Sequence, residues 1–384
     1  MSEYLRRQPT GVSNYPLIRS FTHSLIQNMT YFTPGPAELY PTFAQHLQTA
    51  MDEQLGSISH RSQRFRDIYR HTDEQLRALL NIPKTHAIFF TGSASEVWER
   101  MLLNCVEHES FHAVNGSFSR KFYDYALGLH KYAHILEKPF GEGFDAADTE
   151  VPEYAELVCL THNETSSGVQ MRPAEMHKLK RKYPQKLFCV DMVSSAPYPD
   201  LDYSLIDSAF FSVQKAFGMP AGMGVWIANE KCLAKAERLQ KYESLTIGAH
   251  NTLPMLWKSY QTFETPATPN VLFIYVLGKI AEDFNRIGIS TVRKQTEERA
   301  KTIYKFLEKS DRFEPFVSAE RYRSQTVVVA NTKKPSGEII DAVKRAGMVI
   351  GSGYGKLKDS QIRIANFPAT SAEQIDALLR ELSR

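Results

Sequence analysis

Two polar residues of this 384-residue chain follow short apolar segments and could do chemistry together. Asp191 ends the apolar run 187–190, and Lys215 lies in a turn that follows the run 208–212. A carboxylate at the end of a strand is commonly a turn or helix cap, but it can also pair with a buried cation. A lysine there is either solvated or, when it is desolvated, a nucleophile that can form a Schiff base.

A turn of small residues at 91–95 opens a predicted helix that continues to residue 107. The backbone N–H groups of such a turn can hold an oxyanion, and capping of the helix by Ser or Thr is the alternative. A Schiff-base lysine, a carboxylate for a pyridinium and a helix start for a phosphate are together what pyridoxal phosphate requires. The combination with Asp191 and Lys215 is much more specific than any one of the three.

The elements that must position these residues alternate between strand and helix. Strands are expected at 87–90, 157–160, 187–191, 208–212 and 224–227, with helices at 95–107 and 173–183. This order predicts an α/β fold with a largely parallel sheet. The segment 214–223 is too short for a crossover helix, so we expect the strands on its two sides to be antiparallel. Asp191 and Lys215 fall beyond the carboxyl ends of strands, where ligands bind in such sheets.

Two prolines at 266 and 269 mark a change in the chain. Helical patterns at 271–285 and 291–307 follow them, and then a strand, a helix and a strand at 326–330, 339–346 and 361–365. We therefore predict an N-terminal extension at 1–30, a large domain at 31–264 and a smaller α/β C-terminal domain at 265–384.

The composition excludes several classes of protein. With 46 Lys and Arg against 43 Asp and Glu, the net charge is only +3, and the basic residues form no stripe for nucleic acid. No apolar run reaches the roughly 18 residues of a membrane span, and the N-terminus lacks the apolar core of a secretory signal. The four cysteines are widely spaced and suggest neither a disulfide framework nor a metal site. We expect a cytoplasmic protein with no bound metal.

One motif points to a different enzyme, a zinc protease. His-Glu-Ser-Phe-His at 108–112 matches the H-E-x-x-H pattern, which requires a continuous helix to bring both imidazoles onto one face. Residues 111–114 read instead as a strand that follows a helix, so a chance match is the better interpretation. The glycine-rich segment 351–356 has the wrong spacing for a phosphate-binding loop of a nucleotide enzyme.

Five motifs, in this order and spacing, resemble those of class V, fold-type I, pyridoxal-phosphate aminotransferases, and most closely the phosphoserine aminotransferases. They are Phe-Thr-Pro-Gly-Pro at 32–36, Ser-His-Arg-Ser at 59–62, Thr-His-Asn-Glu-Thr-Ser-Ser-Gly at 161–168, Val-Asp-Met-Val-Ser-Ser at 190–195, and Gln-Lys at 214–215 with Pro-Ala-Gly at 220–222. The resemblance runs from about residue 31 to residue 368. It implies a seven-stranded, mostly parallel sheet in the large domain and pyridoxal 5′-phosphate as the cofactor.

The resemblance also implies roles for single residues. Lys215 would hold the cofactor as a Schiff base and shuttle a proton, and Asp191 would pair with the ring nitrogen. Thr165 would bond the phenolic oxygen, and Phe118 would stack on the ring, where the family often has the larger Trp. The cofactor phosphate would be bound by the backbone of Ser93 and Ala94, by Gln214, and by Thr265 from the second subunit of a homodimer.

Three residues would bind the substrate if the resemblance holds. Arg363 would hold the α-carboxylate with its guanidinium fork, and His60 and Arg61 would read a substrate phosphate across the dimer interface. Two departures from the family pattern weaken phosphoserine as the substrate. Glu264 replaces an amide beside Thr265 and adds repulsion unless a cation compensates, and the loop 351–362 lacks a basic stretch typical of phosphoserine enzymes.

The predicted activity is transfer of the amino group of O-phospho-L-serine to 2-oxoglutarate, giving 3-phosphohydroxypyruvate and L-glutamate, as in serine biosynthesis. Another class V aminotransferase, of the alanine–glyoxylate or serine–pyruvate type, would use the same Lys215, Asp191 and Arg363 and stays open. A cysteine desulfurase is disfavoured, because no cysteine follows Cys232 to supply the nucleophilic thiol.

Overall fold

The computed structural model describes residues 29–241 and 245–384, so the predicted extension 1–30 lies almost entirely outside the described residues. The helices are α1 (Phe43–Asp52), α2 (Gln63–Leu80), α3 (Ala94–Cys105), α4 (Ser117–Gly128), α5 (Pro173–Lys182), α6 (Glu230–Gln240), α7 (Leu253–Tyr260), α8 (Val271–Ile287), α9 (Ile289–Lys309), α10 (Ser336–Arg345) and α11 (Ala372–Leu382). Short 3-10 helices are η1 (Leu55–Ser57), η2 (Ala146–Asp148), η3 (Glu320–Tyr322) and η4 (Gly355–Leu357). The strands are β1 (Thr30–Phe32), β2 (His86–Thr91), β3 (Glu109–Val114), β4 (Tyr132–Glu137), β5 (Leu157–Thr161), β6 (Asn163–Glu164), β7 (Val169–Gln170), β8 (Leu187–Asp191), β9 (Ser208–Ser212), β10 (Gly224–Asn229), β11 (Phe313–Pro315), β12 (Val327–Thr332), β13 (Met348–Ser352) and β14 (Gln361–Ala365).

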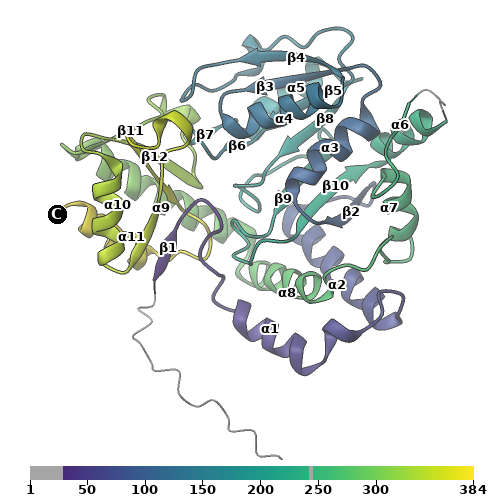
Figure 1. Cartoon of the computed structure of the whole chain (residues 1–384), viewed down its shortest axis with the longest axis horizontal. Coiled ribbons are helices and arrows are strands. Elements are labelled where there is room, and N and C mark those ends of the chain that lie inside the picture. The colour runs from purple at the N-terminus through teal and green to yellow at the C-terminus, as the bar shows by residue number, and fades with distance from the viewer. Residues whose placement is uncertain (1–28, 242–244) are drawn as a thin grey trace, which may run out of the picture.

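A seven-stranded sheet forms the centre of the larger lobe (Figure 1). Its strand order is β2-β10-β9-β8-β5-β3-β4, and only β10 runs against its neighbours. The predicted seven-stranded, mostly parallel sheet is therefore confirmed, and so is the antiparallel pair on the two sides of the segment 214–223.

The central strands are mostly apolar, as expected for a sheet whose two faces are both covered by helices. Alternate residues of one strand enter different clusters: Ile88 and Phe90 pack with α2 and α8, whereas Ala87 and Phe89 pack with α3, α6 and α7. Covering both faces leaves the ends of the strands as the place where polar side chains can gather.

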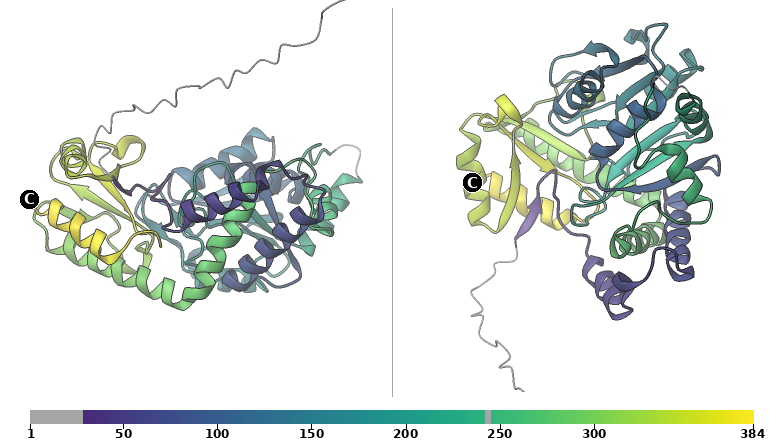
Figure 2. Two further views of the ribbon diagram at one scale, coloured as in Figure 1. Left: turned by 90° about the horizontal axis from the view of Figure 1, so that it is seen from below. Right: turned by 45° about the vertical axis from the view of Figure 1, so that its right-hand side comes forward.

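The smaller lobe contains a five-stranded sheet of order β1-β13-β14-β12-β11. Strand β1, from the start of the described chain, pairs in parallel with β13, more than 300 residues later. Helices α8 and α9 follow one another along one side of the molecule, from the larger lobe to the smaller (Figure 2). Since α8 packs on α2, contacts cross the predicted boundary at residue 265, and the division of the chain at that residue stays a prediction.

The His-Glu-Ser-Phe-His motif does not lie on a helix. Strand β3 (Glu109–Val114) contains the strand predicted at 111–114 and begins two residues earlier, and His108 precedes it. The imidazole of His112 is buried beside Ser110, 2.9 Å from its hydroxyl, whereas the side chain of His108 is 74% exposed. The two imidazoles therefore do not share the helical face that a zinc protease requires.

Candidate functional site

Asp191 is a buried carboxylate at the carboxyl end of β8. Its Oδ1 accepts from the backbone N–H of Val193 at 2.9 Å, and its Oδ2 accepts from the indole N–H of Trp98 at 3.2 Å. Burial raises the pKa of Asp191 to about 7, although both hydrogen bonds oppose that rise. In the described chain no cation lies within ion-pair distance of it, so the site suits a cationic ligand that would keep Asp191 ionised.

Lys215 follows β9, the strand next to β8, and its amine donates to the carbonyl of Pro34 at 2.6 Å. Burial lowers the pKa of Lys215 to about 8, and the positive charge of Arg363 adds to that effect while Asp191 opposes it. Gly35 allows the close approach: its φ is +133°, and a Cβ there would lie 2.1 Å from the lysine nitrogen. The motif at 32–36 therefore shapes the space around the amine.

The turn at 91–95 begins α3, as predicted, and the hydroxyl of Ser93 caps the helix by accepting from the N–H of Glu96 at 3.2 Å. The N–H of Ala94 donates to Ser212 Oγ at 3.3 Å, which ties the helix start to the end of β9. Beside Lys215, the buried Oε1 of Gln214 has no hydrogen-bond partner. The amide oxygen of Gln214 is thus an acceptor open to a ligand, whereas the N–H of Ala94 already has a partner in Ser212.

The buried carboxylate of Glu164 fixes the start of α4, which carries Phe118. It accepts from the N–H and the hydroxyl of Ser119, both at 2.8 Å, from the N–H of Phe118 at 3.2 Å, and from the N–H and the hydroxyl of Ser166 at 3.0 and 2.7 Å. Gly116 leaves room for this carboxylate, since a Cβ there would lie 2.2 Å from Glu164. The next residue, Thr165, is also buried and donates to Ser194 Oγ at 2.7 Å.

Arg363, on β14 of the smaller lobe, reaches the larger lobe. Its Nε donates to the carbonyl of Ser352 at 2.7 Å and its Nη1 to that of Thr165 at 3.2 Å. Its guanidinium carbon lies 5.4 Å from the centre of the Tyr354 ring, and that ring is 5.4 Å from the ring of Phe118. Burial lowers the pKa of Arg363. No carboxylate of the described residues forms an ion pair with it, so its charge is open to an anion.

His60, Arg61 and Thr265 form a separate cluster. His60 Nδ1 lies 3.3 Å from Thr268 Oγ1, and Thr265 is buried with its hydroxyl on the carbonyl of Ala267 at 2.7 Å. No hydrogen bond or ion pair between described residues joins this cluster to Lys215 or Asp191 of the same chain.

Glu264, the departure noted in the sequence, belongs to this second cluster. Arg61 Nη1 donates to its Oε2 at 2.5 Å, and Arg66 binds its Oε1 through Nε at 3.0 Å and also through Nη2. The hydrogen bonds from Arg66 and Arg61 lower the pKa of Glu264. The compensating cation is thus present, but it is Arg61 itself, together with Arg66.

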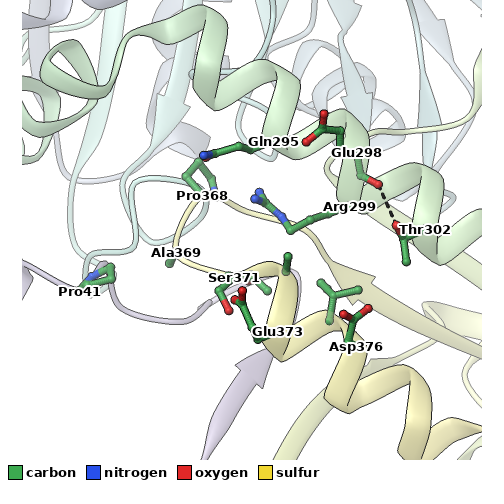
Figure 3. A pocket seen from close by; sticks show the side chains of 13 residues that line it. Pro41, Gln295, Glu298, Arg299, Thr302, Pro368, Ala369, Ser371, Glu373 and Asp376 are labelled. Atoms are coloured by element: carbon green, nitrogen blue, oxygen red, sulfur yellow. Dashed lines mark hydrogen bonds between the residues drawn. The ribbon is translucent and has the colours of Figure 1, made fainter.

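A pocket of about 590 Å³ lies between α9 and the start of α11, and Figure 3 shows Arg299 directed into it. The buried guanidinium of Arg299 donates to Asn366 Oδ1 at 2.7 Å, so it supports the turn after β14. Glu298, Glu373 and Asp376 add negative charge to the wall. The pocket contains none of the residues predicted for the site.

Sequence reasoning missed three residues at the site: Trp98, Lys121 and Tyr354. A tryptophan in the first turns of α3 could have been noticed, because a buried indole N–H needs an acceptor and Asp191 is one. Lys121 and Tyr354 meet only because the loop between β13 and β14 lies against α4 in the fold, and no pattern in the sequence predicts that contact.

A buried carboxylate, a desolvated lysine, an open arginine and a capped helix start at the ends of parallel strands are the parts of a pyridoxal-phosphate transferase site. Comparison with known proteins agrees with this interpretation. The family model described as Aminotransferase class-V matches residues 142–378, and the chain belongs to that family. It is an enzyme, a pyridoxal-phosphate-dependent aminotransferase of fold type I.

Among solved structures, a phosphoserine aminotransferase from Cytophaga hutchinsonii is 47% identical, with a TM-score of 0.91 over 93% of this chain and 99% of that one. A curated phosphoserine aminotransferase from Rhodococcus opacus is 24% identical over 91% of this chain and 93% of its own length. An aspartate aminotransferase from Thermus thermophilus has a TM-score of 0.78 at 22% identity over 92% of this chain and 99% of that one, which shows the shared fold alone.

Proposed function

We propose that this enzyme transfers the amino group of O-phospho-L-serine to 2-oxoglutarate, giving 3-phosphohydroxypyruvate and L-glutamate, as a step of serine biosynthesis in the cytoplasm. The choice of O-phospho-L-serine as the substrate is supported by the similarity, at 47% identity and nearly full coverage, to a phosphoserine aminotransferase. The chemistry is carried by Lys215 and Asp191 at adjacent strand ends. No helix among the described residues has the length and the apolar content of a membrane span.

The residues present fit pyridoxal phosphate. When it is bound, the cofactor supplies a carbonyl for capture of an amino group and an electron-withdrawing ring. Asp191, buried without a direct cationic partner, would hold the protonated ring nitrogen, and Thr165 would bond the phenolic oxygen. The side-chain NH₂ of Gln214 and the backbone N–H groups of Ser93 and Ala94 would donate to the phosphate. The ring of Phe118 would cover one face.

Lys215 and Arg363 would act on the substrate. Because its pKa is lowered to about 8, Lys215 loses its proton far more readily than an ordinary lysine, and its neutral amine can accept a proton from the substrate Cα. Arg363 has Nη2 free of described acceptors, so it can bind the α-carboxylate and orient that Cα–H bond toward the lysine. The partly buried setting keeps water away from the proton that Lys215 holds.

We further propose a homodimer with shared active sites. Thr265 and the pair His60 and Arg61 contact neither Lys215 nor Asp191 within the described part of one chain, which agrees with a role in the partner's site. There Thr265 would contribute to phosphate binding, and His60 and Arg61 would face the substrate.

The test is a titration of the purified, cofactor-loaded enzyme with a panel of amino acids, followed by its absorbance spectrum. We expect O-phospho-L-serine to convert the cofactor to the pyridoxamine form at far lower concentration than alanine or serine. Conversion by alanine with indifference to phosphoserine would replace the proposed substrate by one of the alanine–glyoxylate type. No cofactor band after addition of pyridoxal phosphate would refute the cofactor assignment.

A further inference from the structure

The loop between β13 and β14 brings an aromatic side chain of the smaller lobe onto α4 of the larger one. The loop is tightly closed, since the N–H of Gly353 donates to the carbonyl of Gln361 at 2.7 Å and a Cβ on Gly353 would lie 2.1 Å from the carbonyl oxygen of Leu357. The next residue, Tyr354, packs its ring against that of Phe118 at 5.4 Å, and its hydroxyl accepts from the amine of Lys121 at 3.1 Å.

Two cations therefore lie beside one ring at the site. The amine of Lys121 is 5.7 Å from the centre of the Tyr354 ring, and the guanidinium carbon of Arg363 is 5.4 Å from the same centre. Neither cation forms an ion pair with a carboxylate in the described ranges 29–241 and 245–384. Lys121 is exposed and Arg363 partly buried, so an anion can reach both.

Arg61, which the sequence suggested as a ligand of the substrate phosphate, differs from Lys121 and Arg363 because it already has a carboxylate partner. Its guanidinium already pairs with Glu264 at 2.5 Å and donates to the carbonyl of Pro266 at 3.4 Å. A substrate anion would have to compete with that carboxylate. Lys121, by contrast, has no carboxylate partner among the described residues, and it lies beside the same Tyr354 ring as Arg363.

We propose that Lys121, assisted by the hydroxyl of Tyr354, binds the distal anionic group of the substrate while Arg363 binds the α-carboxylate. This assignment rests on the proposed function, because both phosphoserine and 2-oxoglutarate carry two anionic ends. The chemistry it recognises is a small molecule with a carboxylate at one end and a carboxylate or phosphate at the other. Its charge selects such substrates over amino acids with a neutral side chain.

The experiment measures binding by calorimetry to the cofactor-loaded enzyme, with glutarate as an unreactive two-carboxylate probe and butyrate as its one-carboxylate counterpart. The variants are Lys121→Met, which removes the charge, Lys121→Arg, which keeps it, and Tyr354→Phe, which removes only the hydroxyl. Lys178→Met is the matched control, since Lys178 is an exposed helical lysine that pairs with Glu175 elsewhere on the surface.

We expect Lys121→Met to raise the Kd for glutarate roughly tenfold or more, the size of a lost charged hydrogen bond, and to leave that for butyrate unchanged. The Kd values of Lys121→Arg and Lys178→Met should stay close to those of the wild type. Tyr354→Phe should raise the Kd for glutarate by a smaller factor than Lys121→Met does. An unchanged glutarate Kd in Lys121→Met would overturn the assignment.

An equal loss of affinity for butyrate and glutarate would also overturn the assignment, because it would show that Lys121 and Tyr354 only hold the two lobes together.

The wild-type enzyme separates this proposal from the proposed function. If it takes up the cofactor and reacts with phosphoserine while Lys121→Met behaves normally, only the role of Lys121 fails. If the wild type shows no cofactor band, the proposed function fails, and this assignment with it.

Discussion

Asp191 and Lys215 are perturbed in opposite directions by the same cause. Burial favours the neutral form of each group, so the pKa of the carboxyl rises to about 7 and that of the amine falls to about 8. Perturbed pKa values of this kind are typical of catalytic sites, and the lowered pKa brings the amine close to the pH at which it must exchange a proton. In this enzyme the amine would move the proton, and the carboxylate would hold the ring.

The first prediction concerns the stability of the protein without cofactor. Between about pH 4 and pH 7 the folded chain keeps a proton on Asp191 that the unfolded chain releases, so the contribution of this residue to stability falls as the pH rises. Asp191→Asn cannot ionise. The wild type should therefore lose about 2 kcal/mol of unfolding free energy relative to this variant between pH 5 and pH 8.

Urea unfolding of both cofactor-free proteins at the two pH values checks this prediction. A difference between variant and wild type that is the same at pH 5 and pH 8 would show that Asp191 is not held neutral by burial. The variant should also bind the cofactor more weakly, since its amide cannot neutralise a ring cation.

At the scale of elements, the start of α4 depends on one carboxylate. Glu164 accepts from the backbone N–H of Phe118 and of Ser119 and from two serine hydroxyls, while Gly116 leaves it the necessary space. A charged acceptor at a helix N-terminus also gains from the helix dipole. Glu164 thus fixes the position of Phe118 at the start of α4.

The second prediction is that Glu164→Gln destabilises the protein by about 2–4 kcal/mol, because an amide NH₂ would face donors in a buried place. Glu175→Gln is the control, since Glu175 accepts one backbone N–H, from Ala146 at 2.9 Å, and otherwise pairs with exposed Lys178. It should cost under about 1 kcal/mol. Urea unfolding measures both, and circular dichroism of the cofactor band should change only in Glu164→Gln. Equal effects of the two variants on stability and on the cofactor band would contradict a special role of Glu164 at the site.

Some elements could be predicted from the sequence and others could not, for a physical reason. The strands β5, β8 and β9 are short runs of buried apolar residues, so their own composition predicts them. Strand β1 has only three residues and exists through its pairing with β13, which is far away in the chain. Asp191 and Lys215 could be proposed because each directly follows a predictable strand. Lys121 and Tyr354 depend on how the two lobes meet.

At the scale of the whole molecule, two clusters of predicted site residues lie apart in one chain. Lys215, Asp191 and Arg363 form one of them, and Thr265 belongs to the other with Arg61. A homodimer that places the second cluster of each chain at the first cluster of its partner would complete both sites. Shared sites of this kind can be tested by mixing variants.

The third prediction uses such a mixture. Thr265→Val should weaken cofactor binding about tenfold in its own homodimer, because a bond to the phosphate is lost. A heterodimer with a Lys215→Ala chain has a single lysine-containing site, and that site receives Thr265 from the partner. Its cofactor Kd should therefore equal that of the wild type. A Kd as weak as that of the Thr265→Val homodimer would mean that Thr265 acts within its own chain.

The central claim is that Lys215 carries the cofactor. The most direct test is to reduce the cofactor-loaded enzyme with borohydride, digest it, and locate the modified lysine by mass spectrometry. We expect the added mass of the reduced cofactor on the peptide that contains Lys215 and on no other, and none in Lys215→Ala. Modification of a different lysine, or of none, would contradict the assignment of the active site.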